Sequence, residues 1–366
     1  MRVLIAPDKF KGTLTAQAAA AAIAAGLRPF PGIQIDSCPV ADGGEGFADA
    51  LATRFDTLHS ILDPLGRPVT ARCGWLPDAP TAVIEMSDPS GFHRLTPAER
   101  DPWHASTFGT GQLILHAASR GASRILVGLG GSATNDAGAG AAAALGWTFL
   151  TSDGEPITPI PANFLAIERI EPPDNDTLPP ILAACDVRNP LPGPAGASHT
   201  YARQKGADDR MISHLELALD HLAGLITDQL GIDHRSLPGA GAAGGLGYGL
   251  ATFCSAQLQP GFALIADSLH LEERVAASDL IITGEGSLDL QTLHGKAPAG
   301  LALLAKKYDK PTVIICGRHD PAAHVAEWFD LVITLHSLDP HPASSPAHAA
   351  ALLTRAATLA AQWALH

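Results

Sequence analysis

Short apolar runs and helix-like segments alternate at the start of the chain. Arg2–Pro7 (RVLIAP) is a continuous apolar run, which is typical of a strand buried on both faces. A polar loop follows it, and Thr15 can cap a helix that continues to about Leu27. Residues 33–40 then predict a second strand, and residues 47–55 predict a second helix. This strand–loop–helix order predicts a parallel sheet flanked by helices.

The C-terminal part repeats this rhythm. A helix-like segment at residues 297–307 stands among three short apolar runs, which we interpret as buried strands at 279–283, 312–316 and 331–335. In the middle of the chain, strand-like runs at 83–86 and 125–128 are separated by proline-rich connections. We therefore expect an α/β protein of two α/β domains. A doubly wound, Rossmann-like domain would be built from both chain ends and the other domain inserted, with bounds of 1–65 plus 275–366 and 66–274.

The bulk composition restricts the class of protein. The 366 residues are 46% hydrophobic and 17% charged, which allows a sizeable core. A formal net charge of −13 argues against nucleic acids and anionic membranes as partners, because both attract basic surfaces. No apolar run approaches the ~20 residues of a membrane helix, and the apolar start is too short for a signal peptide. We therefore predict a cytoplasmic protein without nucleic-acid or membrane partners, and we leave a homo-oligomer open.

Cysteines and histidines give no signal of a metal site. The five cysteines are odd in number and form no C-x-x-C pair, which fits reduced thiols. The sixteen histidines show no H-E-x-x-H pattern, so structural zinc is not expected. Chemistry is expected instead in loops that follow strands, because ligands of open α/β sheets bind outside the carboxyl ends of the strands.

Two such loops carry charged residues near the N-terminus. In DKFKG, Lys9 and Lys11 follow Asp8 and stand just before a helix, which suits the capture of a carboxylate or phosphate. In ADGGEG, glycines allow close approach to a ligand, while Asp42 and Glu45 could hold magnesium or accept a hydroxyl proton. The structural alternatives are two solvated lysines in the first loop and a tight, acid-capped turn in the second.

Two further segments are rich in glycine. In GLGGSATND (residues 128–136), successive backbone N–H groups can form an anion-binding nest, with Ser132 and Thr134 as added donors and Asp136 placed to meet a metal ion. A glycine turn of purely structural role is the alternative. PGAGAAGGLGYG (residues 238–249) contains G-x-G-x-x-G, but no strand precedes it, so the dinucleotide-binding fingerprint lacks its context. It predicts a close-approach loop that opens a tightly packed helix, either over a nucleotide or against another helix.

Shorter polar pieces accompany these loops. ACDVRNP brings Asp186, Arg188 and Asn189 after a strand-like run, and QKG supplies Lys205. TGEG contains Glu285 and is followed by HGK at residues 294–296. That last piece is not a Walker A loop, because it lacks the required earlier glycine and the following serine or threonine.

In their order and spacing, seven segments resemble the bacterial glycerate kinase family of the type that includes glycerate 2-kinases. The segments are IAPDKFKGTLTA, ADGGEG, GLGGSATNDAGAG, ACDVRNPL, QKGA, PGAGAAGGLG and ITGEGSLDLQTLHGKAP. They cover the chain from residue 3 to about residue 317. The sequence departs from the family pattern at Lys9, at residues 200–203 and at residues 287–288, and these departures bear on substrate preference more than on reaction type.

The resemblance implies D-glycerate as substrate, ATP as phosphoryl donor, Mg²⁺ as cofactor and phosphoglycerate as product. It also implies two α/β domains with the active site in the cleft between them. Family type favours 2-phosphoglycerate, while phosphorylation of the 3-hydroxyl or of another small hydroxy acid stays open.

Phosphoryl transfer needs alignment and charge neutralisation, and the hypothetical roles follow from that need. The ATP phosphates would be bound by Gly130, Gly131, Ser132, Ala133, Thr134, Gly239, Gly241 and Gly244. The glycerate carboxylate or the transferring phosphoryl group would be held by Lys11 with Arg188 or Lys205, and Asp8 and Lys9 are further candidates for substrate binding. Asp186 or Asp42 would accept the hydroxyl proton, and Asp186 is preferred because Arg188 and Asn189 could orient it. Asp136 or Glu285 would help to position magnesium.

Two other classes of function compete with this hypothesis. A nicotinamide-dependent dehydrogenase would use residues 239–244, which lack the preceding strand. A non-catalytic nucleotide or metabolite sensor could share the scaffold, because fold does not dictate function. The acidic loop residues favour an enzyme over a sensor; they are Asp42, Glu45, Asp136 and Asp186.

Overall fold

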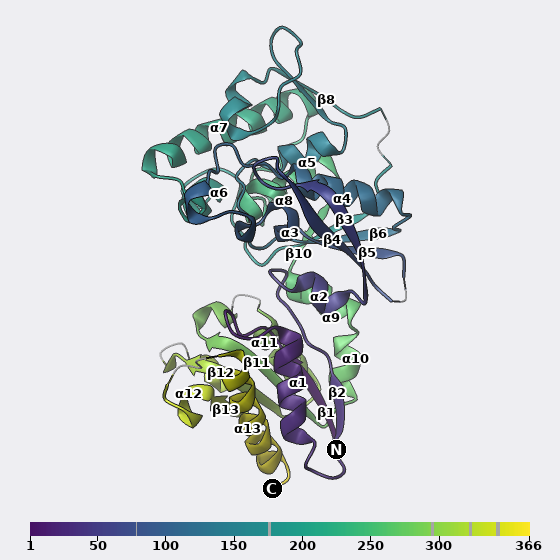
Figure 1. The fold of residues 1–366 in the computed structure, drawn as a ribbon, viewed down its shortest axis with the longest axis vertical. Helices are drawn as coiled ribbons and strands as arrows, with labels where there is room; N and C mark the ends of the chain where they lie inside the picture. The colour runs from purple at the N-terminus through teal and green to yellow at the C-terminus, as the bar shows by residue number, and fades with distance from the viewer. Residues whose placement is uncertain (78, 175–176, 294–295, 322–323, 342–344) are drawn as a thin grey trace. The chain divides into compact units, whose positions relative to one another are not determined.

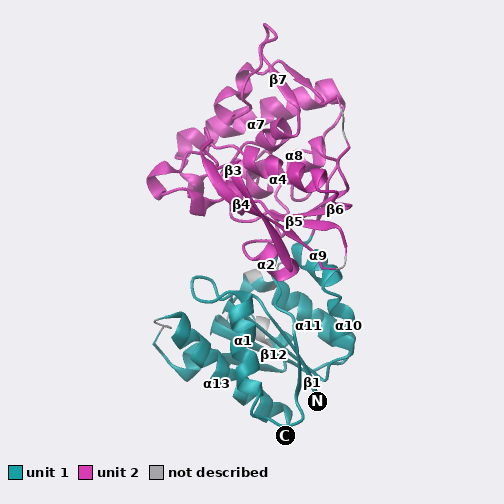
Figure 2. Cartoon of the chain, turned by 45° about the vertical axis from the view of Figure 1, so that its right-hand side comes forward, with its two compact units in different colours: residues 1–42, 260–366 teal, residues 43–259 magenta. Residues whose placement is uncertain are grey.

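The chain forms two compact units, which Figure 2 colours separately. The computed structural model describes residues 1–366 except residues 78, 175–176, 294–295, 322–323 and 342–344. Unit 1 contains residues 1–42 and 260–366, and unit 2 contains residues 43–259. Unit 2 is thus inserted into the sequence of unit 1, and the two changes of unit come earlier than the expected positions near residues 65 and 275.

Unit 1 is built on a five-stranded parallel sheet (Figure 1). The strand order is β13-β12-β11-β1-β2, and all neighbouring pairs are parallel. The strands are β1 Arg2–Pro7, β2 Gln34–Ser37, β11 Leu280–Leu288, β12 Thr312–His319 and β13 Leu331–Thr334. The described helices are α1 Ala16–Leu27, α9 Gly261–Ser268, α10 Leu271–Ala276, η5 Leu290–Leu293, α11 Ala297–Lys307, η7 Val325–Trp328, α12 Leu335–Leu338 and α13 Pro346–Ala364.

Helices cover both faces of this sheet, because its apolar runs direct successive side chains to opposite faces. Val3 and Ile282 pack in one core with residues of α1 and α13, which lie side by side in Figure 1. Ile314 and Cys316 pack in another core with Ala302 of α11. The doubly wound arrangement predicted for the chain ends is therefore confirmed.

Most predicted elements of the chain ends are present. β1 and α11 have the predicted bounds, and Thr15 caps α1 by accepting a hydrogen bond from the Ala18 N–H at 3.1 Å. The second predicted helix was wrong in length, because α2 (Phe47–Leu51) ends before the expected residue 55. The backbone is extended from Arg54 onward, because this segment forms a strand that pairs with a later strand of the sequence.

Unit 2 is built on a six-stranded mixed sheet of order β10-β9-β6-β5-β4-β3. Its strands are β3 Arg54–Leu62, β4 Pro68–Trp75, β5 Thr81–Glu85, β6 Arg124–Gly128, β9 Ile181–Ala184 and β10 Gln257–Gln259, and a separate antiparallel pair is β7 Thr148–Leu150 with β8 Arg169–Glu171. Its described helices are α2, α3 Ser87–Ser90, η1 Phe92–Arg94, η2 Pro97–Glu99, α4 Phe108–Ser119, α5 Ala139–Ala144, η3 Pro161–Ala166, α6 Ala197–Tyr201, η4 Arg203–Lys205, α7 Asp209–Leu230 and α8 Ala242–Phe253.

Strand pairing and helix packing assign the segments near the two changes of unit. β3 and β4 form an antiparallel hairpin, and β4 continues antiparallel to β5, so the chain from residue 54 onward belongs to the sheet of unit 2. At the other end, Phe262 of α9 packs against Gly300 of α11, which places α9 in unit 1. One face of the unit 2 sheet packs against apolar residues of α4 and α8, such as Leu113 and Leu246.

Two further observations concern the chain as a whole. Within the described residues, no helix is both long and apolar enough to cross a membrane. All five cysteines are free, and four of them are buried. Burial raises the pKa of the Cys38, Cys73, Cys185 and Cys316 thiols to values of about 11 or 12.

Candidate functional site

Three of the predicted acids lie near one edge of the unit 1 sheet. Asp8 follows β1, and its N–H donates to the Gly284 carbonyl of β11 at 2.8 Å. Asp42 comes after β2, shortly beyond Val40, whose N–H donates to the Pro7 carbonyl. Glu285 lies in the second half of β11. Parallel strands end at the same edge of their sheet, so three separate sequence segments bring carboxylates to one place.

Two lysines accompany these acids and complete what we call the Asp8 cluster: Asp8, Lys9, Asp42, Glu285 and Lys296. The Lys9 Nζ lies 3.9 Å from Asp42 Oδ1, and the Lys296 Nζ lies 3.8 Å from Glu285 Oε2. The Asp8 Oδ1 accepts a hydrogen bond from the Lys9 N–H at 2.6 Å. The cluster thus holds three carboxyl groups and two ammonium groups, a set that can bind an anionic substrate and also accept a proton.

Burial alters the acidity of two of these carboxyls. It raises the pKa of Asp8 to about 6, with a further contribution from the charge of Asp42 and opposition from Lys9. It raises the pKa of Glu285 to about 7, although a 2.7 Å hydrogen bond from Thr292 Oγ1 and the charge of Lys296 act in the opposite direction. A carboxyl group with a pKa near neutrality is suited to general-base work, so Asp8 joins the acids to be considered for that role.

Other predicted residues of unit 1 are less enclosed. The Lys11 side chain is exposed, in a turn that is anchored by Phe10, which is 3% exposed and lies against Gly284. His294 and Gly295 lie outside the described residues.

In unit 2, the second and third predicted loops pack against each other. A Cβ on Gly130 would lie 2.5 Å from the Gly44 Cα, and one on Gly128 would lie 2.8 Å from the Gly43 carbonyl oxygen. The absence of side chains at these positions is therefore needed for the contact between the loops. Glu85, at the end of β5, accepts hydrogen bonds from the Gly46 and Ala48 N–H groups and so ties α2 to the sheet.

The third loop also pairs with the segment that follows β5. The Phe92 N–H donates to the Gly131 carbonyl at 3.0 Å, and the Ala133 N–H donates to the Ser90 carbonyl at 2.9 Å. The predicted nest therefore loses one donor, because the Ala133 amide is already used within the protein.

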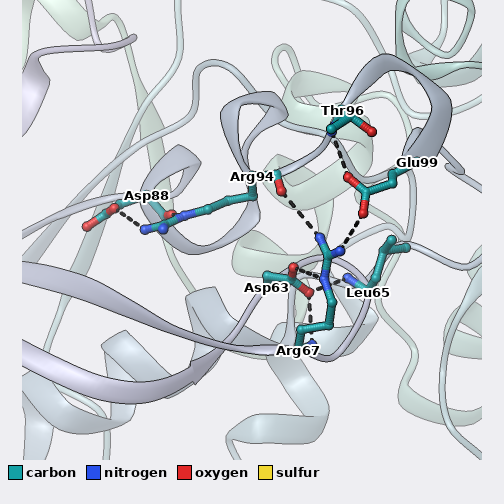
Figure 3. Close-up of polar contacts among 7 residues, drawn as sticks. All are labelled: Asp63, Leu65, Arg67, Asp88, Arg94, Thr96 and Glu99. Atoms are coloured by element: carbon teal, nitrogen blue, oxygen red, sulfur yellow. Dashed lines mark hydrogen bonds and ion pairs between the residues drawn. The ribbon is translucent and has the colours of Figure 1, made fainter.

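A charged network pins this segment to the hairpin of β3 and β4 (Figure 3). Arg67 Nε donates to Asp63 Oδ2 at 2.6 Å, and Arg67 Nη1 donates to Glu99 Oε1 at 2.6 Å. Arg94 Nη2 donates to Asp88 Oδ1 at 2.7 Å. Asp63 is buried and also accepts from two backbone N–H groups. The network thus supports the residues that hold the third loop in place.

Beneath the third loop lies a fully buried lysine. Lys205 ends η4, is 1% exposed, and donates from Nζ to Ser132 Oγ at 2.7 Å and to the Thr134 carbonyl at 2.6 Å. A Cβ on Gly244 would lie 2.8 Å from the Lys205 Nζ, so this glycine leaves room for the ammonium. The structure therefore brings together four predicted residues from three separate segments of the sequence; we call Ser132, Thr134, Lys205 and Gly244 the Lys205 cluster.

Asp136 is enclosed by hydrogen-bond donors of the protein. Its Oδ2 accepts from the Thr107 N–H at 2.7 Å, the Thr107 hydroxyl at 2.8 Å and the Gly140 N–H at 3.2 Å, and its Oδ1 accepts from the Gly138 N–H at 3.3 Å. Complete burial nevertheless raises its pKa. A metal ion could reach Asp136 only by displacing these donors, so the geometry favours a structural role over the predicted one.

The glycines before and within α8 serve close packing. A Cβ on Gly244 would lie 1.9 Å from the Thr134 carbonyl oxygen, one on Gly239 would lie 2.8 Å from Cys185 Sγ, and one on Gly241 would lie 2.3 Å from the Pro190 carbonyl oxygen. Of the two sequence-based alternatives for this segment, close packing within the protein accounts for all three glycines. Within the described residues no strand leads into it, so the context of a dinucleotide fingerprint is missing.

Asp186 and Arg188 follow β9, where the sequence predicted them. Asp186 is half-buried and Arg188 is exposed. The Asn189 amide does not orient Asp186 in the predicted way: its Nδ2 donates to the Ala195 carbonyl at 2.7 Å, and its Oδ1 accepts from the Tyr201 hydroxyl at 2.7 Å. Asn189 thus fixes the chain around α6 instead.

Sequence reasoning did not assign roles to several residues that shape these sites. Thr107 holds Asp136, Glu85 holds α2, and Ser198 Oγ accepts from Asn135 Nδ2 at 3.2 Å. Glu85 had a detectable signal, since it is the single charged residue in an apolar strand. Thr107 and Ser198 lie far along the sequence from their partners and had no such signal.

Comparison with known proteins identifies the family of the chain. The glycerate kinase family matches residues 3–365. The chain is 43% identical to the glycerate 2-kinase of Escherichia coli (strain K12) over 326 residues, which cover 87% of this chain and 85% of that protein. It is also 43% identical to the glycerate kinase of Bacillus subtilis (strain 168) over 324 residues, with the same coverage.

A crystal structure shows the same fold. It is that of a protein from Salmonella typhimurium LT2, described there provisionally as glycerate kinase 2, and it superposes with a TM-score of 0.86 and 38% sequence identity. The match covers 99% of this chain and 98% of that protein. The sequence resemblance and the mixed α/β fold with parallel strands agree, and the chain is an enzyme that belongs to the glycerate kinase family.

Proposed function

We propose that this kinase transfers the γ-phosphoryl group of ATP to the 2-hydroxyl of D-glycerate. The observation that carries the proposal is the Asp8 cluster, in which two lysines that can bind a carboxylate adjoin carboxyl groups with raised pKa values. The name of the Escherichia coli relative, glycerate 2-kinase, supports the 2-position.

Within the Asp8 cluster, Lys9 and Lys296 would hold the carboxylate of glycerate. Phosphoryl transfer also needs a group that accepts the proton of the attacking hydroxyl. The candidates are Asp186 and Asp42, as the sequence indicated, and Asp8, whose pKa of about 6 suits a base at neutral pH. Lys11, which is exposed, would contribute charge toward the transferring phosphoryl group.

In unit 2, the exposed part of the third loop would bind the ATP phosphates. Gly131 is exposed and has a φ of 70°, and Gly130 is half-buried. Backbone N–H groups in such glycine-rich loops are common phosphate ligands. The exposed guanidinium of Arg188 adds a charged donor in the same unit.

The residues present fit magnesium that arrives with the nucleotide. The described residues contain no group of three or more His, Cys, Asp or Glu that could hold a metal ion by itself. Mg²⁺ typically binds one or two carboxylates together with waters and substrate phosphates, so such a group is not required. Glu285 would be the protein ligand, in preference to the enclosed Asp136. When bound, the ion would neutralise phosphate charge.

The proposal is tested by a coupled ADP-release assay with ATP, Mg²⁺ and D-glycerate, with the product identified by phosphorus NMR. We expect turnover that yields 2-phosphoglycerate. Formation of 3-phosphoglycerate would contradict the regiochemistry alone. Absence of turnover with D-glycerate, but turnover with another hydroxy acid, would contradict the substrate.

The same assay identifies the base. Asp8→Asn, Asp42→Asn and Asp186→Asn are compared under saturating substrates. The variant that lacks the base should lose about 10²–10⁴-fold in kcat with little change in KM for glycerate, because the proton acceptor acts in the transition state. Near-normal turnover in a variant removes that residue from the list.

A further inference from the structure

Lys205 lies in a place where the protein supplies little to balance the positive charge of its ammonium form. Its side chain is buried, and the described residues include no carboxylate within 4.0 Å of its Nζ. Its two hydrogen-bond partners, the Ser132 hydroxyl and the Thr134 carbonyl, are both neutral. Burial consequently lowers the pKa of Lys205 to about 7, with Asp136 opposing from a greater distance. An unbalanced buried charge is costly, so a counter-charge from a ligand would be favourable.

The hydrogen bond to Ser132 also fixes how that hydroxyl can act. A serine hydroxyl has one hydrogen to donate and can accept two hydrogen bonds. Because Lys205 donates to Ser132 Oγ, the Ser132 hydrogen remains to be donated elsewhere. Within the described part of the chain no residue accepts it, and Ser132 directly follows the exposed Gly131 in the sequence.

The neighbouring Thr134 also has a buried hydroxyl group without a hydrogen-bond partner among the described residues. Its carbonyl, in contrast, is bound by Lys205. Among the described residues, the Lys205 cluster therefore holds an ammonium with no carboxylate within 4.0 Å, a serine hydrogen with no acceptor and a threonine hydroxyl with no partner. A phosphate group at the loop would accept the Ser132 hydrogen and would bring a negative charge near the Lys205 ammonium.

We propose that Lys205 is a positioning residue that acts through Ser132: its ammonium orients and polarises the Ser132 hydroxyl, which then donates to a phosphate oxygen of the nucleotide. This inference deepens the proposed function and rests on it for the identity of the ligand. Lys205 itself need not contact the nucleotide, which agrees with its burial below the loop. Gly244 is required for the hydrogen bond from Lys205 to Ser132, because any side chain at position 244 would displace the ammonium.

A double-mutant cycle on nucleotide binding tests this assignment. Ser132→Ala removes the hydroxyl, and Lys205→Gln removes the charge while keeping N–H donors for Ser132 and Thr134. The probe is the Mg²⁺ complex of the non-hydrolysable ATP analogue AMP-PNP, and its Kd is measured by titration calorimetry. Circular dichroism and Tm verify that each variant is folded. Binding is read directly, so the result does not depend on whether glycerate is the acceptor.

Each single variant should weaken binding about tenfold to a hundredfold, as expected for a charge-assisted hydrogen bond. The Kd of the double variant should exceed the higher of the two single-variant Kd values by no more than about threefold, because both changes interrupt the same chain of contacts. In turnover assays, the KM for the acceptor should change less than threefold. Matched controls are Ser213→Ala on α7 and Lys310→Gln in unit 1, which should bind AMP-PNP like the wild type.

Three outcomes would overturn the assignment. Multiplicative losses in the double variant would mean that Lys205 contacts the nucleotide independently of Ser132. Wild-type affinity in folded Lys205→Gln would mean that the charge has no role. Failure of the wild-type enzyme to bind AMP-PNP would contradict the assignment of a nucleotide as the ligand of this loop. If Lys205→Gln does not fold, Ser132→Ala alone decides, since unchanged affinity in that variant contradicts the relay. Nucleotide binding without glycerate turnover would instead contradict the proposed function and leave the relay standing.

Discussion

At the scale of single residues, burial decides which predicted side chains keep their ordinary chemistry. Lys205, Asp136 and Glu285 were predicted from residue type and loop context alone, as groups that meet a ligand. The structure buries all three and gives each a different set of partners. Lys205 is held by two neutral acceptors, Asp136 by four donors, and Glu285 by one hydroxyl and a more distant lysine. The same residue types therefore carry different chemistry because their surroundings differ.

The raised pKa of Glu285 predicts how stability depends on pH. Below about pH 4 the carboxyl is protonated in both the folded and the unfolded chain. As pH rises, the unfolded chain releases its proton first, so the stability contributed by the neutral carboxyl is lost by about pH 7. A shift from 4.5 to about 7 corresponds to a loss on the order of 3 kcal/mol.

Glu285→Gln should therefore flatten the fall in Tm between pH 5 and 8, because glutamine stays neutral and can still accept from Thr292. Tm is measured by scanning calorimetry across that range. Glu273→Gln, on the exposed side of α10, is the matched control and should retain the wild-type slope. An unchanged slope in Glu285→Gln would contradict the raised pKa.

At the scale of elements, glycines decide how closely α8 approaches the third loop. Ala243, Gly244 and Gly245 all have positive φ values, so the start of α8 is not regular helix. Gly249 of the same helix lies against the Ala137 carbonyl, where a Cβ would come within 2.4 Å. The segment that resembled a dinucleotide fingerprint is thus a backbone-to-backbone packing surface.

This packing predicts opposite effects for two glycine-to-alanine substitutions. Gly244→Ala should destabilise the protein by about 3 kcal/mol or more, because the new methyl group meets the Thr134 carbonyl and the residue has a φ of 71°. Gly224→Ala, inside α7 with nothing within 4 Å of the added Cβ, should stabilise it by about 0.5–1 kcal/mol. Urea denaturation measures both. Equal effects of the two substitutions would contradict the packing account.

At the scale of the whole molecule, the two units differ in how their chains are arranged. Unit 2 is one continuous stretch, residues 43–259, with its own mixed sheet and apolar cores. Unit 1 needs both chain ends, because β1 pairs with β2 on one side and with β11 on the other. One continuous stretch of chain therefore contains every strand of the unit 2 sheet, whereas the unit 1 sheet is complete only with both chain ends.

We accordingly expect a fragment of residues 43–259 to fold on its own. Its thermal unfolding, followed by circular dichroism, should be cooperative, and its amide NMR spectrum should be well dispersed. A fragment of residues 1–42 is the control and should stay unfolded, since β1 lacks its partner β11. A non-cooperative transition in the longer fragment would show that unit 2 depends on unit 1.

The sequence alone determined the features that depend on neighbouring residues. The apolar run of β1, the Thr15 cap of α1 and the segment of α11 could be read directly, because strand and helix formation follow local periodicity and capping. The ordered set of loop motifs also identified the family, which the comparisons confirm.

Tertiary structure alone decided the features that depend on distant partners. The helix expected through residue 55 gave way to β3 because β4 offered a hydrogen-bonded partner, and this moved residues 43–65 into unit 2. Asp136 accepts a hydrogen bond from Thr107, and Lys205 donates one to Ser132 across 73 positions of sequence. No local sequence pattern encodes such long-range contacts, because the burial and hydrogen bonding of a side chain depend on the segments that the fold packs against it. Residue type determined which chemical groups the chain offers. The fold determined which of them are engaged within the protein and which are left to contact a ligand.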